Sequence, residues 1–381
     1  MKLLFWLSVT IIAYAYAGYP LMLALLRMVR TRPVNKSDWE PTVTVVIAAR
    51  NEEQIIENRI KNILGQEYPA EKIEVVVVSD GSTDRTVEVL DSLEFGSVKV
   101  VALANSQGKA MAVNEGVLQA GGEIIVFTDV RQKFAPDAIR QLVANFTDQE
   151  VGCVSGELFF LQDGESSVAA EMGAYWKYEK WIRKAEGQTG SVVGATGAIY
   201  AIRRALYRPL SPGTLLDDVM TPLVIAQSHF RVVFEGGSHA FDIVSKDVSQ
   251  EWKRKVRTLA GNWQLLSLRP SLLFPWCNPL WWRFLSHKIA RLLVPFAMIG
   301  ALAASCVLDG LLYRMALTGQ LLLYVAAAAA GTMPQIRKVK LLNLCYFLVV
   351  MNLAALVGFW RWVTGQSATA WKAAHAGGAV K

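Results

Sequence analysis

The sequence has few of the residues that build disulfides or metal centres. Its 381 residues include only four cysteines and four histidines. The cysteines form no C-x-x-C pair, and no histidine has a partner at metal-ligand spacing. We therefore expect unpaired cysteines, in a reducing compartment or in lipid, and no histidine-based metal site.

Charged residues are also scarce, at 19% of the chain, whereas hydrophobic residues reach 53%. That hydrophobic share is high for a soluble protein and too low for a chain that lies wholly in lipid. The net charge is +7, but no RNP, zinc-finger or basic-zipper pattern accompanies it, so we expect no nucleic-acid partner. The basic excess suits a protein at an anionic membrane surface that handles an anionic substrate.

The first long apolar run covers residues 3–28, and about 20 such residues cross a bilayer as a helix. A cleavable signal is the alternative, because residues 13–18 are small or aromatic. The run continues beyond that point and is followed, not preceded, by the basic residues Arg30, Arg32 and Lys36. We therefore predict an uncleaved anchor followed by a cytoplasmic domain.

Further apolar runs lie near the end of the sequence. Tryptophans mixed with basic residues predict an interfacial helix over 271–288. Residues 289–361 are long and apolar enough for about three transmembrane helices, followed by a tail over 362–381. The number of spans places the tail outside, whereas its basic residues favour the inside, and the sequence leaves this open.

Residues 40–270 read as one α/β domain. Short β-branched runs alternate with segments of helical periodicity, with strands expected at 43–49, around Val75, at 98–103 and at 123–128. Repeated βα units of this size predict a doubly wound, mostly parallel sheet with right-handed crossovers. The first strand is followed by Ala48-Ala49-Arg50-Asn51 and not by G-x-G-x-x-G, which argues against a nicotinamide-dependent oxidoreductase.

Polar residues follow three of these strands. Asn51, Asp80 and Asp129 each lie just past a carboxyl end, where open α/β sheets bind ligands. The alternative for Asp80 is that it only caps the turn at Gly81.

The later part of the domain has a looser pattern. Residues 171–186 predict an aromatic-rich helix, for which core packing or membrane contact is favoured over a platform for sugars. Residues 191–203 predict a strand interrupted by glycines, which would let the backbone approach a ligand closely.

Several ordered motifs resemble those of family 2 glycosyltransferases. They are V-T-V-V-I-A-A-R-N-E-E from Val43, V-V-V-V-S-D-G-S-T-D from Val75, G-K-A-M-A-V-N from Gly108, V-F-T-D-V from Val126 and L-L-D-D-V from Leu215. The resemblance covers about residues 42–268, and the flanking runs are similar to those of membrane-bound cellulose, hyaluronan and poly-N-acetylglucosamine synthases. It implies a GT-A fold and an inverting transfer of sugar from a nucleotide donor, with UDP expected.

The resemblance also implies roles for the residues that bind the donor. Asn51, Glu52 and Asp80 would border the nucleoside, with Asp80 near the uracil. Lys109 would lie near the nucleotide. Asp129 takes the place of the first aspartate of the family's D-x-D metal-binding pair.

Two further carboxylates match the family's E-D element. Asp218 takes the place of the catalytic base, and Asp217 stands where the glutamate stands. An acceptor hydroxyl must lose a proton to such a base, and a carboxylate can accept it when proton transfer accompanies bond formation in a dry site. The alternative is that both residues merely begin a helix, where negative charge is favourable.

The sequence departs from the D-x-D pattern, because Arg131 replaces the second aspartate. A hard cation prefers carboxylate oxygens. We therefore expect Mg²⁺ or Mn²⁺ to bind through Asp129, the diphosphate and another carboxylate. The alternative is that Arg131 itself pairs with the diphosphate.

A second departure lies in the Q-x-x-R-W element with which processive synthases bind the acceptor. Arg257 matches the arginine, but Arg254 stands in place of glutamine and Thr258 in place of tryptophan. Loss of the indole removes a sugar-stacking surface, so we expect a different acceptor or transfer of a single sugar. Arg254 and Arg257 would then contact the diphosphate or lipid phosphates, unless they only form a solvated basic face.

The sequence thus predicts a transferase in a bacterial-type inner or plasma membrane, acting at the cytoplasmic face on a polysaccharide or lipid-linked acceptor. One alternative is transfer of one sugar to a polyprenyl-phosphate carrier. Another is a non-catalytic, donor-binding partner of a different synthase.

Overall fold

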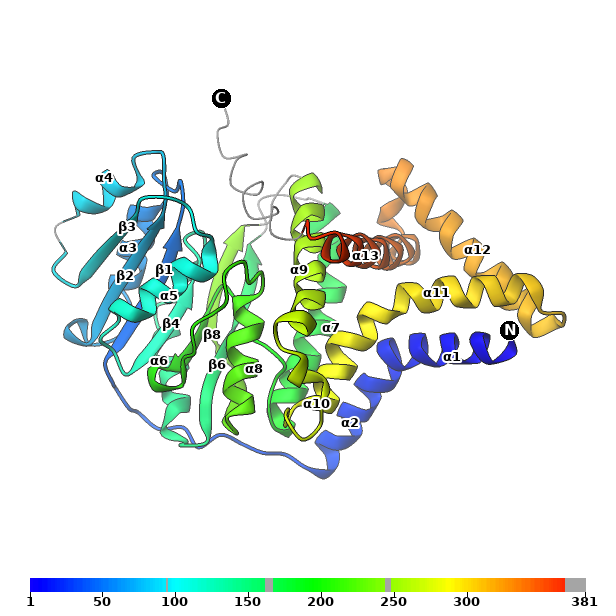
Figure 1. The fold of residues 1–381 in the computed structure, drawn as a ribbon, viewed down its shortest axis with the longest axis horizontal. Coiled ribbons are helices and arrows are strands. Elements are labelled where there is room, and N and C mark those ends of the chain that lie inside the picture. Colours follow the sequence, from blue (N-terminus) through cyan, green and yellow to red (C-terminus); the bar gives the residue numbers. More distant parts are fainter. Residues whose placement is uncertain (94, 162–166, 244–247, 367–381) are drawn as a thin grey trace.

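The computed structural model describes residues 1–93, 95–161, 167–243 and 248–366. Its centre is an eight-stranded mixed sheet with the order β3-β2-β1-β4-β7-β6-β8-β5 (Figure 1). The strands are β1 (Val43–Ala49), β2 (Ile73–Asp80), β3 (Val98–Leu103), β4 (Ile124–Thr128), β5 (Lys133–Phe134), β6 (Val151–Leu161), β7 (Tyr200–Arg203) and β8 (Arg231–Ile243).

The predicted parallel half of the sheet is confirmed. β1 lies between β2 and β4 and is parallel to both, with Val43 opposite Ile73 and Ile124, and β3 extends the parallel set beyond β2. The remainder is mixed, because β7 is antiparallel to β4 and β6, and β5 is antiparallel to β8. Of the predicted strand over 191–203 only β7 is regular, preceded by a turn that joins Thr196 to Ile199.

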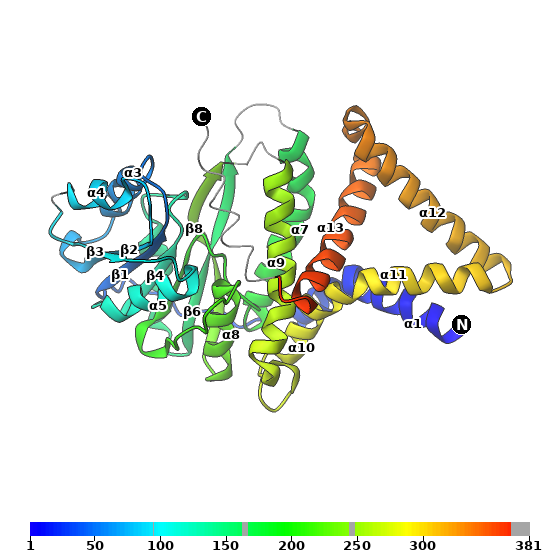
Figure 2. The ribbon, with the colours of Figure 1, turned by 45° about the horizontal axis from the view of Figure 1, so that its top comes forward.

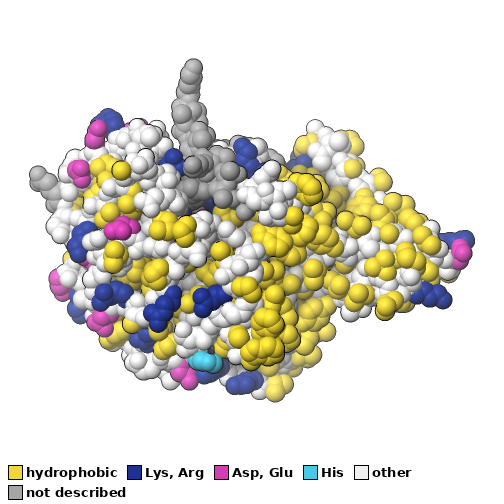
Figure 3. Space-filling view, in the orientation of Figure 1, with side chains coloured by type: hydrophobic (Ala, Val, Ile, Leu, Met, Phe, Trp, Pro, Cys, Tyr) yellow, Lys and Arg dark blue, Asp and Glu magenta, His cyan; other side chains and the backbone are white. Residues whose placement is uncertain are grey.

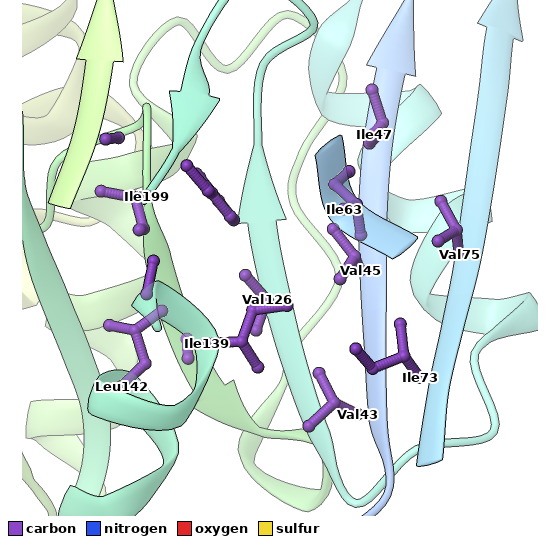
Figure 4. Packing of buried hydrophobic residues seen from close by; sticks show 14 of the residues in the cluster. Val43, Val45, Ile47, Ile63, Ile73, Val75, Val126, Ile139, Leu142 and Ile199 are labelled. Atoms are coloured by element: carbon purple, nitrogen blue, oxygen red, sulfur yellow. The ribbon is translucent and has the colours of Figure 1, made fainter. Parts of the chain in front are cut away.

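Helices cover both faces of the sheet. On one face α3 (Ile56–Leu64) lies over β1, with Ile63 next to Val45, and α6 (Ala138–Val143) lies beside β4, with Ile139 next to Val126 (Figure 4). On the other face α5 (Lys109–Gln119) packs on β1 and β2, and α8 (Asp217–Gln227) packs on β6 and β8, with Val46, Ile125 and Phe127 in the same core. Side chains alternate along a strand, so the apolar run of β1 supplies both cores at once. Helix α4 (Thr86–Asp91) follows β2 at the edge.

Four helical segments of the described chain are long and apolar enough to cross a membrane. They are Lys2–Val29, Trp281–Val307, Leu311–Thr332 and Lys340–Val363. They contain α1 (Lys2–Ala13), α2 (Tyr19–Val29), α10 (Trp281–Phe284), α11 (Ala290–Val307), α12 (Leu311–Thr332) and α13 (Lys340–Val363). Four such helices agree with the predicted number of spans.

The expected interfacial helix over 271–288 is not a single helix. A short 3-10 turn, Pro270–Leu273, is followed by irregular chain, and a new helix begins at Trp281 and continues into α11. Asn278 closes the turn, because its side chain donates to the carbonyl of Leu272 and accepts from the amide of Leu280. A side chain that bonds local backbone in this way competes with a continuous helix.

Two long helices lie between the sheet and the apolar helices in both views (Figures 1 and 2). They are α7 (Ser167–Thr189) and α9 (Val248–Leu268). Helix α2 packs on α7 and α13 packs on α9. The predicted aromatic helix is therefore present, and its aromatic side chains Tyr178 and Trp181 contact the core around Tyr19 and Leu23 of α2. This is the packing role favoured by the sequence.

Candidate functional site

The loops after β1 and β2, at the carboxyl edge of the parallel strands, are joined by hydrogen bonds. Asn51 has a φ of 56°, a left-handed conformation that asparagine tolerates better than most residues. Its backbone amide donates to Ser82 Oγ (3.1 Å), and its Oδ1 accepts from the amide of Thr83 (2.8 Å). The amide of Glu52 donates to Thr86 Oγ1 at 2.8 Å. The loops after β1 and β2 are thus fixed relative to each other.

Asp80 joins the loop after β2 to the loop that leads into α5. Its carboxylate accepts hydrogen bonds from Ser106 Oγ (2.8 Å) and from the amides of Gln107 (2.7 Å) and Gly108 (3.0 Å). The side chain is buried. Asp80 therefore organises the backbone just before Lys109. The contact with uracil that the resemblance implies stays a prediction.

Lys109 lies between two of the predicted carboxylates. Its Nζ is 2.9 Å from Asp129 Oδ1 and 3.2 Å from Asp217 Oδ2. Burial disfavours the charged amine, but the carboxylates of Asp129, Asp217 and Asp218 outweigh burial and raise the pKa of Lys109. Burial likewise works against the ionised Asp129, and the neighbouring Lys109 still holds the pKa of Asp129 below its usual value. The pair is charged at neutral pH.

Asp218 lies in the first turn of α8 and has the opposite shift. Burial and the adjacent charge of Asp217 raise the pKa of Asp218 to about 6. Its Oδ2 accepts a hydrogen bond from the amide of Gly197 at 3.1 Å. Asp218 therefore combines burial with a raised pKa, which is the property by which a general base is recognised.

The 194–197 loop leaves little space for a side chain where it meets Asp218. A Cβ on Gly197 would lie 3.0 Å from Asp218 Oδ2. The backbone at Gly197 thus lies close to the side chain of a catalytic candidate, and the predicted approach to a ligand stays a prediction. Arg183 of α7 holds the same loop, because its guanidinium donates to Thr196 Oγ1 (2.5 Å) and to the carbonyl of Gly194 (3.0 Å). Sequence reasoning missed Arg183, since nothing local links it to a loop more than ten residues later.

Glu52 also interacts electrostatically with charged residues of this site. Burial raises the pKa of Glu52 to about 7, with Arg131 opposing and Asp129 and Asp84 reinforcing the shift. The loop after β1 therefore brings Glu52 within electrostatic reach of Asp129, although the two are far apart in sequence.

The charges of Arg131 and Arg257 both act on Arg254. Burial, followed by the charge of Arg131, lowers the pKa of Arg254, and Arg257 acts in the same direction against the opposing charge of Glu251. Glu251 pairs with Arg254 at 3.6 Å. Arg257 also acts on Asp129. Helix α9 thus brings two guanidinium groups to the carboxyl edge of the sheet, where Arg131 lies, and the cluster suits a polyanion.

The donors around Asp129 fit only part of a metal site. In the described ranges no group of three histidine, cysteine, aspartate or glutamate side chains is placed to hold a metal ion. The expected pair, Asp129 with one other carboxylate, is smaller than such a group, and Asp217 shares the Lys109 amine with Asp129. Asp129 could supply one oxygen, and the remaining ligands of a cation would be the diphosphate and water.

An α/β sheet with buried carboxylates and a lysine at its carboxyl edge, attached to candidate membrane spans, defines a membrane-associated enzyme of the nucleotide-binding α/β class. The family model described as "Glycosyl transferase family 2" matches residues 44–210. Residues 44–210 therefore match this family of glycosyltransferases.

Known proteins similar to this chain agree with that assignment. Poly-beta-1,6-N-acetyl-D-glucosamine synthase of Staphylococcus aureus (strain COL) is 23% identical over 229 residues, covering 59% of this chain and 55% of the relative. The synthase of Staphylococcus epidermidis (strain ATCC 35984) is 21% identical over the same shares. The chain thus spans about half the length of the curated relatives it matches.

A solved structure is similar over almost the whole chain. The mannosyltransferase PcManGT from Pyrobaculum calidifontis, in complex with GDP-Man and Mn²⁺, superposes with a TM-score of 0.70 at 23% identity. The match covers 95% of this chain and 99% of that one. The fold is therefore the predicted GT-A fold with flanking apolar helices.

Proposed function

We propose that the protein transfers a sugar from a nucleotide donor, with inversion at the anomeric carbon, to a glycan or lipid-linked acceptor at the cytoplasmic face of a membrane. The observation that carries this proposal is the Lys109 amine held between Asp129 and Asp217, next to an Asp218 whose pKa is raised to about 6. It provides a cation for a diphosphate and a base for an acceptor hydroxyl within one site.

In the proposed reaction the residues have separate tasks. Asp218 accepts the proton of the acceptor hydroxyl as the oxygen attacks the anomeric carbon from the face opposite the diphosphate. Lys109, Arg131, Arg254 and Arg257 stabilise the negative charge that grows on the leaving diphosphate. Asn51 and Glu52 border the nucleoside. The loop carrying Gly197 keeps Asp218 oriented.

A divalent cation such as Mg²⁺ or Mn²⁺ would be held by Asp129 together with the diphosphate. It would supply further neutralisation of the leaving group. The arginine cluster offers the same stabilisation without a metal. The two possibilities predict opposite responses to chelation.

One feature of α9 favours a single transfer to a lipid carrier, such as polyprenyl phosphate, over processive extension of a glycan. Thr258 stands where the Q-x-x-R-W element has its tryptophan, and its hydroxyl donates to the carbonyl of Arg254 at 3.0 Å. The position therefore offers no aromatic surface on which a growing glycan could stack.

The test is release of free nucleotide by membranes that carry the full chain. Donors would include UDP-N-acetylglucosamine, UDP-glucose and GDP-mannose, each with and without EDTA and with added polyprenyl phosphate or glycan primers. We expect release from one donor, and loss with EDTA if a cation at Asp129 is required. Asp218→Asn should abolish release, whereas Lys61→Gln, which removes a surface charge on α3, should not. A protein that binds donor but shows no release with any acceptor would be a non-catalytic partner instead.

A further inference from the structure

A second polar pocket lies away from the sheet edge, between the 208–214 loop, α8 and the end of α9. Its volume is about 60 Å³. Two arginines and three hydroxyl side chains contribute to its lining: Arg208, Arg269, Ser211, Thr214 and Thr221. No residue to which the proposed reaction assigns a role lines this pocket.

The pocket carries positive charge without a protein counter-charge. Arg208 donates to the carbonyl of Tyr207 (3.2 Å), and Arg269 donates to the side-chain oxygen of Gln227 (2.6 Å). Both acceptors are neutral, and neither guanidinium forms a salt bridge with a carboxylate in the part of the chain that the structure describes. Two such guanidinium groups at one pocket favour an anion, and phosphate oxygens match their geometry.

A buried hydroxyl group in the pocket wall also lacks a partner. Thr221 is only 3% exposed, and its Oγ1 has no hydrogen-bond partner among the described residues. A buried polar group without a partner costs free energy, and such a group needs an explanation. A ligand oxygen in the pocket would accept its hydrogen bond.

The same pocket is connected to the most exposed aromatic segment of this face. The amide of Gln227, which also binds Arg269, donates to Ser271 Oγ (3.2 Å) and to the carbonyl of Cys277 (3.0 Å). Between these two residues, Phe274 and Trp276 stack on each other and are 44% and 79% exposed. Exposed aromatic residues of this kind lie at the headgroup level of membranes.

The surface around the pocket is basic on one side and apolar on the other. Figure 3 shows Lys and Arg side chains on the face over α8, next to a continuous hydrophobic surface over α10 and the chain before it. A cationic pocket at the border of an apolar surface fits a molecule with a phosphate and acyl chains better than a free ion.

We propose that this pocket binds the phosphate of an anionic phospholipid headgroup. Arg208 and Arg269 contact the phosphate oxygens, and the hydroxyl of Thr221 donates a hydrogen bond to one of them. The acyl chains would extend along the apolar surface beside Phe274 and Trp276. Thr221 lies one helical turn beyond Asp217 on the same stripe of α8, so the bound lipid steadies the helix whose first turn carries the candidate base Asp218. The proposal does not depend on which sugar is transferred.

The test is native mass spectrometry of the full chain, released from nanodiscs that contain equal amounts of phosphatidylglycerol and phosphatidylcholine. We expect the wild-type protein to retain phosphatidylglycerol selectively. Arg208→Gln and Arg269→Gln should each reduce its occupancy about fivefold or more, because each removes a charge-assisted contact. Lys61→Gln removes one positive charge elsewhere and should leave occupancy unchanged.

Thr221→Val keeps the volume of the side chain and removes only its hydroxyl group. It should fold normally and lower occupancy, even if Arg269→Gln disturbs the link to Gln227. Equal occupancy in wild type and all three pocket variants would refute the proposal. Retention of inorganic phosphate in place of the lipid, when phosphate is added to detergent-purified protein, would also refute it and identify a free-anion site. Lipid binding is measured without donor or acceptor, so loss of transferase activity leaves the result interpretable.

Discussion

At the scale of single residues, the site depends on the different surroundings of its neighbouring carboxylates. Asp129 and Asp217 share the Lys109 amine, whereas the side chain of Asp218 is bonded to a backbone amide. The shared cation favours ionisation of Asp129, and burial beside Asp217 disfavours ionisation of Asp218. Asp129 therefore stays ionised, whereas the pKa of Asp218 is brought closer to neutral pH, where it can exchange a proton.

Replacement of Asp218 by Asn should separate catalysis from folding. The amide keeps an oxygen for the Gly197 amide but cannot accept the proton, so we expect sugar transfer to fall by about 10²–10⁴-fold. Folding raises the pKa of Asp218 from 3.8 to about 6. The protonated side chain therefore stabilises the fold below pH 3.8, this contribution is lost as the pH rises to about 6, and the ionised side chain opposes folding at higher pH. Asp218→Asn should therefore keep or raise the thermal midpoint at pH 8, measured by scanning fluorimetry of the detergent-purified chain. Full activity in this variant would remove Asp218 from the mechanism.

The raised pKa of Asp218 also sets an expected pH profile. The base acts only when it is unprotonated, so kcat/KM of the wild-type enzyme should rise with pH and reach half of its plateau near pH 6. Initial rates between about pH 4 and 8 would show it, because a free aspartate with a pKa of about 3.9 would already be close to its plateau by about pH 5. A midpoint near the value of a free aspartate would contradict the burial of the base in the working enzyme.

At the scale of elements, the carboxyl edge depends on tight contact between loops that belong to different βα units. Gly81, in the turn after β2, has a φ of 61°, and a Cβ there would lie 2.4 Å from the amide nitrogen of Ser106. The turn therefore presses directly on the loop whose next residues bind Asp80. The sequence showed that glycine permits a turn here, and the structure adds the reason for its close packing.

Gly81→Ala should disturb this contact at two levels. The side chain meets backbone that cannot swing away, and the left-handed conformation disfavours alanine, so we expect a loss of about 1–3 kcal/mol in the free energy of unfolding. Donor binding should weaken as well, because the loop before Lys109 shifts. Gly96→Ala is the matched control, since a Cβ at Gly96 meets no atom within 4 Å. Chemical denaturation and donor titration would measure both effects, and identical results for the two variants would contradict this account.

At the scale of the whole molecule, a buried polar cluster joins the catalytic domain to the apolar helices. His287, in the segment between α10 and α11, lies between two glutamates of α7, with its Nδ1 2.9 Å from Glu186 Oε1 and its Nε2 2.8 Å from Glu179 Oε1. Arg291 donates to Glu179 Oε2 at 2.7 Å, and the hydroxyl of Tyr19 in α2 donates to Glu186. Three segments distant in sequence meet here. From sequence alone His287 had no partner, because both glutamates are about 100 residues away.

This cluster predicts that docking of the domain on its helices is sensitive to acid. Burial disfavours the ionised form of Glu186, yet the charge of His287 and the hydrogen bonds outweigh burial and lower the pKa of Glu186 below 4.5. A lowered pKa stabilises the fold above the unfolded value of about 4.5, and this contribution is lost as the pH falls below it. The thermal midpoint of the full chain should therefore drop as the pH falls below 4.5.

Glu186→Gln should reproduce part of that loss at pH 7, by about 3 kcal/mol, because it leaves buried cations without a counter-charge. Glu88→Gln is the control, since Glu88 pairs with Arg85 on the surface. Thermal unfolding of the full chain in detergent at both pH values would measure the change. A Glu186→Gln protein as stable as the Glu88→Gln protein would show that the cluster does not hold the two parts together.

The sequence by itself determined what depends on local pattern and on ordered motifs. Runs such as 43–49 and 73–80 are strands because β-branched residues repeat there without a helical period, and the apolar runs are long enough to span a membrane. Together with the family motifs, they predicted the parallel half of the sheet and the GT-A fold. The domain limits at 40–270 and the role of each site residue stay predictions.

Only the tertiary structure decided which distant residues meet. Three sets of contacts join positions that no sequence period or spacing relates. They are the antiparallel pairing of β7 with β4, the hydrogen bonds of Arg183 to the 194–197 loop, and the contacts of His287 with Glu179 and Glu186. The same holds for the pocket of Arg208, Arg269 and Thr221, which α8, α9 and a loop form together. Contacts of this kind arise when packed elements bring side chains together, and a linear pattern does not record that packing.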